Sequence, residues 1–359
     1  MKVDLGRLFF RYYLKNKRLS NSRIDMDQVD TILFFSNTAI GDTLFATPAL
    51  NLIKKYYPNK RIIALLNPKN YKLFETNPYI DDILLFNGKW RGFITILYKL
   101  RNINIDVSLI MNGNEPQATP LAYCVGSKYI IRAPNINNEF NYLHYNKPIK
   151  KDFSKNTIYT RLKQLECIGI TEESYKMEIF PKHDWRNPVK KILEKDKFKY
   201  IGIQVGASTP SRMWVDAKWI SLAKKILEHD ESIKIVLTGS PSEEGITQTI
   251  ERGVNNSRLL NLAGKFNICS AAALLEALDL LITPDTGPLH VAAALKTPTI
   301  AISVAGVASS SNPIDKKVPH VFIDKPKTCT PCIDKRCKNA FCMDQISVNE
   351  VFLNAIKLL

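Results

Sequence analysis

Residues 31–42 read TILFFSNTAIGD, and this stretch sets the pattern that the rest of the chain repeats. Its first six residues, TILFFS, form a continuous apolar run, which is typical of a strand buried on both faces of a parallel sheet. NTAIGD then predicts a loop, followed by a helix to about Tyr57. That helix begins either at Thr47-Pro48, as N-cap and first helical residue, or at Asp42 with a kink at the proline.

The same alternation continues through the first half of the chain. Further strands are predicted at RIIALL (61–66), DILLF (82–86), DVSLIM (106–111) and KYIIRA (128–133), with helical patterns between them. Strands that alternate with helices build a parallel sheet with right-handed crossovers. We therefore expect an α/β fold of the Rossmann type.

The alternation restarts at KYIGIQV (199–205), after a less patterned linker at about 171–198. Asp216 is expected to cap a helix that runs to about His229. Further elements are predicted as strands at IKIVLTG (233–239), RLLNLAG (258–264) and TIAISV (299–304) and a helix at 270–281. The predicted organisation is an N-terminal doubly wound domain at 1–180 that includes a basic segment at 1–25, a C-terminal doubly wound domain at 181–345, and a C-terminal helix at 346–359.

Composition limits the classes of function. The chain has 359 residues, 45% of them hydrophobic, which suits about two packed domains. The formal charge of +16 favours anionic partners: nucleic acid, phosphorylated metabolites or an acidic membrane surface. There is no run of 18 apolar residues and no secretory signal, so we expect a cytoplasmic protein without a transmembrane helix.

The first 20 residues, MKVDLGRLFFRYYLKNKRLS, are basic and aromatic. Their apolar members recur at spacings that fit one face of a helix, with arginines and lysines among them: Leu5, Leu8, Phe9, Tyr12 and Tyr13. Two alternatives stay open. The helix could pack on the first domain, or it could attach the protein peripherally to an anionic membrane, the cytoplasmic face of the inner membrane.

Four loops carry the informative polar residues, and each follows a predicted strand. They lie at 37–42, 206–214, 240–245 and 283–290. Ligands of parallel α/β sheets bind beyond the carboxyl ends of the strands. We therefore expect two sheets that face each other across a cleft, with a binding edge on each.

Asp285-Thr286-Gly287 is also the tripeptide that holds the catalytic carboxylate of aspartic proteases. Those enzymes are β-rich and need two carboxylates that share a proton, which argues against a protease here. Gly287 lets the backbone approach a ligand closely, and the start of the next helix favours phosphate. Thr286 adds a hydroxyl, whereas Asp285 is expected to orient the loop or a sugar hydroxyl. His290 could donate to a phosphate oxygen or be satisfied against the sheet edge.

Asp42 follows Gly41 at the end of the loop that contains Thr38. Its carboxylate could accept a proton from a substrate hydroxyl. It could equally cap the following helix. The local sequence leaves both roles open, and Thr38 and Gly41 are expected to support the loop.

Four motifs together resemble one known family. They are GDTLFATPAL (41–50), GASTPSRMW (206–214), LTGSPSEE (237–244) and TPDTGPLHVAAALKTPTIAI (283–302). In this order they resemble those of the bacterial heptosyltransferases, glycosyltransferase family 9, and the resemblance runs from about residue 31 to 359. It implies a GT-B fold with an N-terminal acceptor domain and a C-terminal donor domain. It also implies inverting transfer of heptose from ADP-L-glycero-D-manno-heptose to the lipopolysaccharide inner core, the lipid A-core acceptor, with no cofactor required for catalysis.

Carried over residue by residue, the resemblance implies that Asp42 is the general base. It implies a donor site made of Ser208, Arg212, Glu243, Asp285, Thr286, Gly287 and His290. Arg212 stands where members often have lysine, which keeps the charge beside the diphosphate and adds a bidentate fork. Glu243 is implied to bind the ribose, although it could simply favour the first turn of a helix. Phe266 could pack on the adenine or belong to the core.

A cysteine cluster lies near the C-terminus. CTPCIDKRCKNAFC (329–342) places Cys329, Cys332, Cys337 and Cys342 within 14 residues. Four thiols in a cytosolic chain indicate a structural zinc or iron site. Disulfides or free thiols are the alternatives, and disulfides are disfavoured in a reducing compartment.

Two other functions compete with the heptosyltransferase hypothesis. The enzyme could use another nucleotide sugar or a protein acceptor such as an autotransporter. Alternatively, the net charge could indicate a non-enzymatic binder of nucleotides or RNA. The chain has no helix-turn-helix or stacking-aromatic signature, so no nucleic-acid partner is expected.

Overall fold

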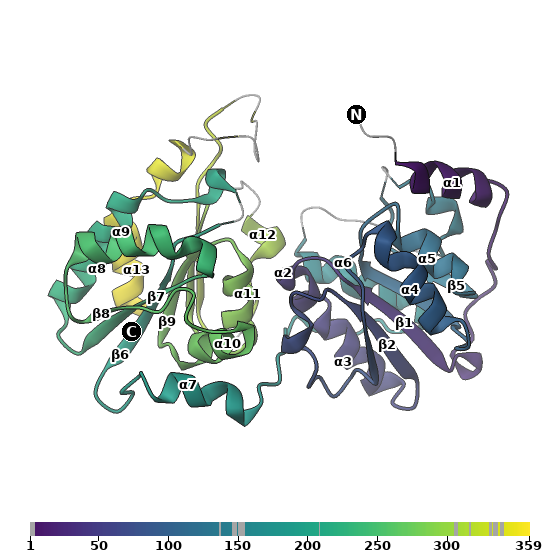
Figure 1. The fold of residues 1–359 in the computed structure, drawn as a ribbon, viewed down its shortest axis with the longest axis horizontal. Helices are drawn as coiled ribbons and strands as arrows, with labels where there is room; N and C mark the ends of the chain where they lie inside the picture. Colours follow the sequence, from purple (N-terminus) through teal and green to yellow (C-terminus); the bar gives the residue numbers. More distant parts are fainter. Residues whose placement is uncertain are drawn as a thin grey trace. The chain divides into compact units, whose positions relative to one another are not determined.

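The computed structural model describes residues 4–135, 138–145, 149, 155–207, 209–304, 308–315, 317–329, 332, 337 and 341–359. The chain divides into two compact units, Met1–Glu178 and Ile179–Leu359. Each unit holds one parallel sheet flanked by helices (Figure 1). The predicted α/β class with two doubly wound, Rossmann-like units is confirmed.

The first unit is built on a five-stranded sheet with the order β3-β2-β1-β4-β5. Its strands are β1 (Thr31–Ser36), β2 (Arg61–Leu66), β3 (Asp82–Leu85), β4 (Val107–Asn112) and β5 (Tyr129–Ile131). All six residues of β1 are buried, as its apolar run predicts for a central strand covered on both faces. Because β1 pairs with both β2 and β4, the strand order reverses beside it.

The helices of the first unit are short. They are α1 (Leu5–Leu14), α2 (Ile40–Leu44), α3 (Thr47–Tyr56), α4 (Trp90–Leu100), α5 (Ala118–Cys124) and α6 (Thr157–Lys163). The segment after β1 forms two helices, α2 and α3, where the sequence left open a single helix from Asp42 or a start at Thr47. Pro48 lies in the first turn of α3, where its missing N–H costs no helical hydrogen bond.

The second unit has a six-stranded parallel sheet with the order β11-β10-β9-β6-β7-β8. Its strands are β6 (Lys199–Gln204), β7 (Ile233–Thr238), β8 (Leu259–Asn261), β9 (Leu280–Pro284), β10 (Thr299–Ser303) and β11 (His320–Asp324). Here the order reverses beside β6, which pairs with both β7 and β9. The edge strand β11 was missed because four of its five residues are only half-buried and because it lacks a long continuous apolar run.

Seven helices are described in the second unit. They are α7 (Asn187–Lys190), α8 (Asp216–His229), α9 (Glu244–Val254), α10 (Ile268–Ala277), α11 (Gly287–Ala294), α12 (Ala308–Ser311) and α13 (Val348–Leu358). Two predictions need correction. The helix expected at 270–281 ends at Ala277, and Leu280 already starts β9. Asp216 is the first helical residue of α8, and the N-cap is Val215. The negative charge of Asp216 is therefore favourable next to the positive end of the helix dipole, but Asp216 is not the cap.

The hydrophobic core of the second unit lies between its sheet and its helices. Trp214 and Trp219 are fully buried and meet edge to face with ring centroids 5.0 Å apart. Val351 and Ala355 of α13 belong to the same cluster, so the C-terminal helix completes this core. Among the described residues, no helix is long and apolar enough to cross a membrane.

Candidate active site

The loop after β1 positions Asp42. Its side chain is 37% exposed, and its Oδ2 accepts a hydrogen bond of 2.9 Å from Thr38 Oγ1. The N-cap of α2 is Ala39, which makes no side-chain hydrogen bond, so the alternative that Asp42 is the helix cap is wrong. Gly41 lies inside α2 and is buried, whereas it was expected in the loop. The carboxylate of Asp42 is held in place and remains accessible.

Arg161 of α6 is the neighbour that the sequence did not predict. Its Nη2 lies 3.7 Å from Asp42 Oδ1, and its side chain is only 15% exposed. Burial lowers the pKa of Arg161 to about 10, and the charge of Asp42 opposes that shift. The guanidinium therefore stays protonated at neutral pH and places a positive charge beside Asp42. No local motif marks Arg161, since it comes from a segment far from β1 in the sequence.

A second buried network surrounds Glu115, in the loop after β4. Arg132 Nη1 lies 2.6 Å from Glu115 Oε1 and its Nη2 donates to Gly113 O over 3.1 Å. Burial raises the pKa of Glu115 and lowers that of Arg132, and each ion opposes the shift of the other. Thr119 Oγ1 donates to Glu115 Oε1 and lies 2.9 Å from His144 Nε2.

The loops after β1 and β4 are the two that meet where the strand order of the first sheet reverses. In open α/β sheets this reversal is the usual place for a ligand. Asp42 and Glu115 follow these two strands, and each has an arginine partner from another segment: Arg161 of α6 and Arg132 after β5. The charge of Arg132 also contributes to lowering the pKa of Arg161, so the two guanidinium groups are close enough to interact. The candidate site of the first unit is thus the accessible carboxylate of Asp42 beside the buried, positively charged guanidinium of Arg161.

In the second unit the loops after β6 and β9 meet in the same way. Arg212 lies in the 3₁₀ turn Pro210–Arg212, is exposed, and its Nη1 donates to Asp285 O over 3.1 Å. The structure therefore brings together two residues that the sequence placed in one donor site. Ser208, assigned to the same site, lies outside the described residues.

The carboxylate of Asp285 is engaged within its own unit. Ser311 Oγ donates to its Oδ2 over 3.1 Å, and His290 Nε2 lies 3.8 Å from its Oδ1. The side chains of Asp285 and His290 are only 12% and 7% exposed. Of the two roles left open for Asp285, these contacts favour holding the loop over binding a sugar hydroxyl.

Thr286 and Gly287 form the start of α11. Thr286 is the N-cap, and its Oγ1 donates to Pro284 O over 3.3 Å. Pro288 has no N–H, and the N–H of Leu289 already bonds to Thr286 O. The start of α11 therefore offers an anion the N–H of Gly287 and the positive end of the helix dipole, fewer donors than a helix start without proline.

Glu243 is tied into the loop after β7. Its Oε2 accepts from Ser240 N and Oγ in a capping box, and its Oε1 accepts from Gln204 Nε2 over 3.0 Å. A Cβ at Gly206 would clash with the Glu243 carboxylate, so a larger residue there would have to displace Glu243 from this contact. Glu243 thus has the helix-start role that the sequence offered as the alternative, and its contact with a ribose stays a prediction. Phe266 is half-buried in the bend between β8 and α10.

The structure describes only part of the cysteine cluster and does not test the predicted metal site. In the described part of the chain, no three His, Cys, Asp or Glu side chains are grouped so that they could hold a metal ion. Thr328 lies between two of the thiols, with its Oγ1 3.8 Å from Cys329 Sγ and 3.1 Å from Cys342 Sγ. The zinc or iron site at Cys329, Cys332, Cys337 and Cys342 stays a prediction from the sequence.

Two Rossmann-like units, each with charged groups at the reversal of its sheet, define a two-domain α/β protein with a candidate ligand-binding edge on each sheet. A family model described as glycosyltransferase family 9 (heptosyltransferase) matches residues 96–342, more than half of the chain. The lipopolysaccharide core heptosyltransferase OpsX of Haemophilus influenzae is 23% identical over 270 residues, which are 74% of this chain and 76% of that relative.

Solved structures agree on the fold. The glycosyl transferase family 9 from Veillonella parvula has a TM-score of 0.80 at 18% identity and covers 92% of this chain and 97% of its own. The E. coli ADP-heptose lipopolysaccharide heptosyltransferase II has a TM-score of 0.74 at 17% identity, with 91% and 98% covered. The chain belongs to glycosyltransferase family 9, and its fold is the predicted GT-B fold.

Proposed function

We propose that this glycosyltransferase is an inverting heptosyltransferase of lipopolysaccharide core assembly, with ADP-L-glycero-D-manno-heptose as donor. Family membership over residues 96–342 supports transfer of a glycosyl group. The names of two similar proteins, a lipopolysaccharide core heptosyltransferase and an ADP-heptose heptosyltransferase, support the choice of acceptor and donor. The observation that carries the proposal is Asp42, an accessible carboxylate fixed by Thr38 where the first sheet reverses its order.

In the proposed reaction a hydroxyl oxygen of the acceptor attacks the anomeric carbon of the donor. The bond from that carbon to the diphosphate oxygen breaks, and ADP leaves with the electron pair. Asp42 accepts the proton of the hydroxyl, for which a carboxylate within hydrogen-bond reach suffices. A single displacement of this kind inverts the configuration at the anomeric carbon.

In this proposal the second unit supplies the positive charge that stabilises the leaving diphosphate. Arg212, exposed beside the start of α11, is proposed to bind the diphosphate as negative charge develops on it. Gly287 is proposed to add an N–H, and Thr286 a hydroxyl that would turn from Pro284 O to the diphosphate. Asp285, held by Ser311 and His290, keeps this loop in shape.

Arg161 gives the first unit a further role in the same proposal. Its guanidinium lies 3.7 Å from the Asp42 carboxylate, on the side opposite the oxygen that Thr38 holds, so the two contacts together fix the orientation of the carboxylate. Arg161 cannot itself accept or release a proton in the reaction, because its guanidinium stays protonated at neutral pH. We assign it a positioning role.

A panel of donors tests the proposal. The chain is incubated with lipopolysaccharide that lacks heptose and with ADP-heptose, UDP-glucose or GDP-mannose, and the products are identified by mass spectrometry. We expect addition of heptose from ADP-heptose, and NMR of the product should show the anomeric configuration opposite to that of the donor. Transfer from another nucleotide sugar, or to a protein acceptor only, would replace the donor or acceptor assignment. Salt-sensitive binding to RNA without any transfer would contradict the enzymatic assignment.

A further inference from the structure

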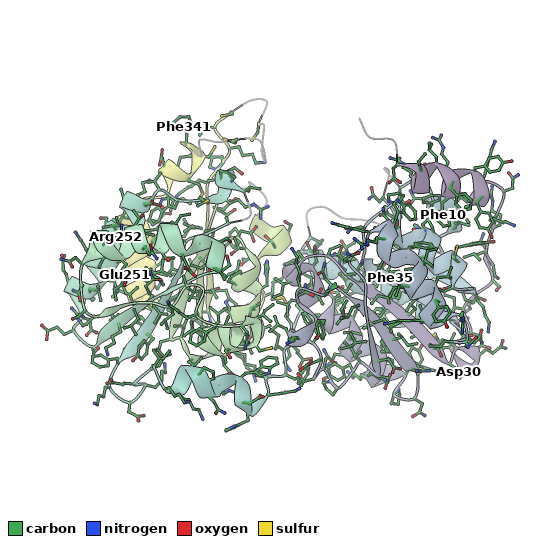
Figure 2. The ribbon with its side chains drawn as sticks, in the orientation of Figure 1. Phe10, Asp30, Phe35, Glu251, Arg252 and Phe341 are labelled. Carbon is green, nitrogen blue, oxygen red and sulfur yellow. The ribbon has the colours of Figure 1, made fainter. Side chains whose placement is uncertain are left out.

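Helix α1 has two apolar faces, and only one of them is covered. The covered face packs on the first unit through Phe10 and Leu14, which are 8% and 0% exposed. Figure 2 shows Phe10 on the side of α1 that faces the rest of that unit. The ring of Phe10 stacks on Trp90 with centroids 5.2 Å apart, and Trp90 Nε1 donates to the N-cap Asp4 over 2.7 Å. The helix is therefore a fixed part of the first unit, which confirms the first of its two predicted roles.

The second apolar face is open. Four large side chains on it are strongly exposed: Leu5 by 75%, Leu8 by 50%, Phe9 by 59% and Tyr12 by 85%. Their spacing of three, four and seven residues places them on one side of the helix. Isolated exposed leucines are common, but four large apolar side chains side by side on one helix indicate a surface that is covered by a partner. We call these four residues the α1 outer face.

Positive charge flanks the α1 outer face. Residues 4–20 contain five basic residues and one acidic residue, Asp4, which caps the helix. The basic side chains are Arg7, Arg11, Lys15, Lys17 and Arg18. Arg7 and Arg11 share Glu139 as a counter-ion at 2.7 and 3.8 Å, while their side chains stay 54% and 72% exposed. The surface thus joins apolar side chains to cations that remain accessible.

Apolar and aromatic side chains beside accessible cations are complementary to one surface chemistry, that of a bilayer with anionic headgroups. The apolar side chains enter the boundary between headgroups and acyl chains, where a tyrosine places its hydroxyl in the wet layer. The cations lie at the level of the phosphates. In the part of the chain that is described, no helix is long and apolar enough to span a bilayer.

We propose that the α1 outer face, with Arg11, Lys15 and Lys17 beside it, docks this protein on an anionic membrane surface. The proposal is independent of the donor and acceptor, because it rests on α1 alone. Packing of Phe10 against Trp90 fixes the docked helix to the first unit, so membrane contact would hold that unit close to the bilayer.

Vesicle cosedimentation of the full chain tests the proposal. The vesicles are made of phosphatidylcholine alone or with 30% phosphatidylglycerol. We expect at least tenfold tighter binding to the anionic vesicles and a marked loss of binding at 0.5 M salt, since screening weakens the electrostatic part. Equal binding to both kinds of vesicle, or none to either, would overturn the proposal.

Two variants separate the apolar and electrostatic parts. The variant Leu8→Ser/Phe9→Ser/Tyr12→Ser should lose at least tenfold in binding, whereas the matched control Leu353→Ser, an exposed leucine of α13, should bind as wild type. All of these side chains are at least half exposed, so the thermal midpoint is expected to stay unchanged, and this is measured in parallel.

The variant Arg11→Gln/Lys15→Gln/Lys17→Gln should weaken binding to anionic vesicles about fivefold per charge and leave binding to neutral vesicles unchanged. Wild-type binding by both variants would refute the docking surface. A concentration-dependent dimer in sedimentation velocity that the serine variant abolishes, with vesicle binding unaffected, would assign the α1 outer face to a second copy and overturn the proposal.

Discussion

Replacing Asp42 by asparagine tests the assignment of the base most directly. Asparagine has nearly the same shape, and its Oδ1 can still accept the 2.9 Å hydrogen bond from Thr38. It cannot take a proton from the acceptor hydroxyl. General-base catalysis contributes about 10²- to 10⁴-fold, so kcat should fall by at least that much, or about 2.7 to 5.5 kcal/mol in the barrier.

The same substitution removes the charge that faces Arg161. At 3.7 Å the gross Coulomb term is about 1 to 4.5 kcal/mol, for effective dielectric constants of 80 to 20. Asp42 is 37% exposed and the pair is longer than a hydrogen bond, so solvent screening reduces the net loss to about 1 kcal/mol. This corresponds to a fall of about 2 to 4 °C in the thermal midpoint of the first unit.

The assay measures kcat by the release of ADP and the affinity for ADP by calorimetry. We expect a large fall in kcat and an ADP affinity within about twofold of wild type, because the donor residues belong to the second unit. Asp82→Asn is the matched control: it removes another carboxylate of the first unit, 2.7 Å from Arg61 at an exposed site, and should leave kcat unchanged. A kcat of Asp42→Asn within threefold of wild type would refute the base assignment.

Three further predictions follow from the contacts. Arg212→Ala should weaken ADP binding by about 10- to 100-fold, the worth of a charge-assisted contact with the diphosphate, and unchanged calorimetry would remove it from the donor site. Gly206→Ala should cost about 1 to 3 kcal/mol in urea denaturation because its Cβ displaces Glu243 from Gln204, whereas Gly245→Ala, with nothing within 4 Å of the added Cβ, should not destabilise. Burial lowers the pKa of His144 to about 3 from its ordinary 6.5, so the unfolded chain binds a proton that the folded chain does not between these values, and stability is lost as pH falls. The wild type should therefore lose about 2 kcal/mol more than His144→Gln between pH 8 and pH 5, and equal losses would contradict this.

Helices and strands could be predicted where a pattern of neighbouring residues is enough to define them. TILFFS predicted β1 at its observed bounds because a strand covered on both faces needs only a continuous apolar run. The end of α10 was missed because leucines at 278 and 281 fit a helix and a buried strand equally well, and pairing of β9 with β6 and β10 decides between them.

The sequence predicted which loops carry the site residues, but not which other residues contact them. Asp42, Arg212 and the loop of Asp285 could be placed beyond strand ends because that position depends on the order of elements along the chain. Their partners could not be predicted. Arg161 reaches Asp42 from α6, and Ser311 reaches Asp285 from α12, through contacts that no local pattern encodes.

The sequence by itself determined two α/β units, the family, and which loops carry the polar groups, because periodicity and turn residues are properties of neighbouring positions. The tertiary structure decided which charges neutralise one another and which surface is left uncovered. Asp42 is paired with Arg161, and Glu243 accepts a hydrogen bond from Gln204. Helix α1 buries one of its own apolar faces against the first unit and leaves the other exposed. These outcomes depend on which segments the sheet order and packing bring together, and burial then fixes the cost of leaving a charge unpaired.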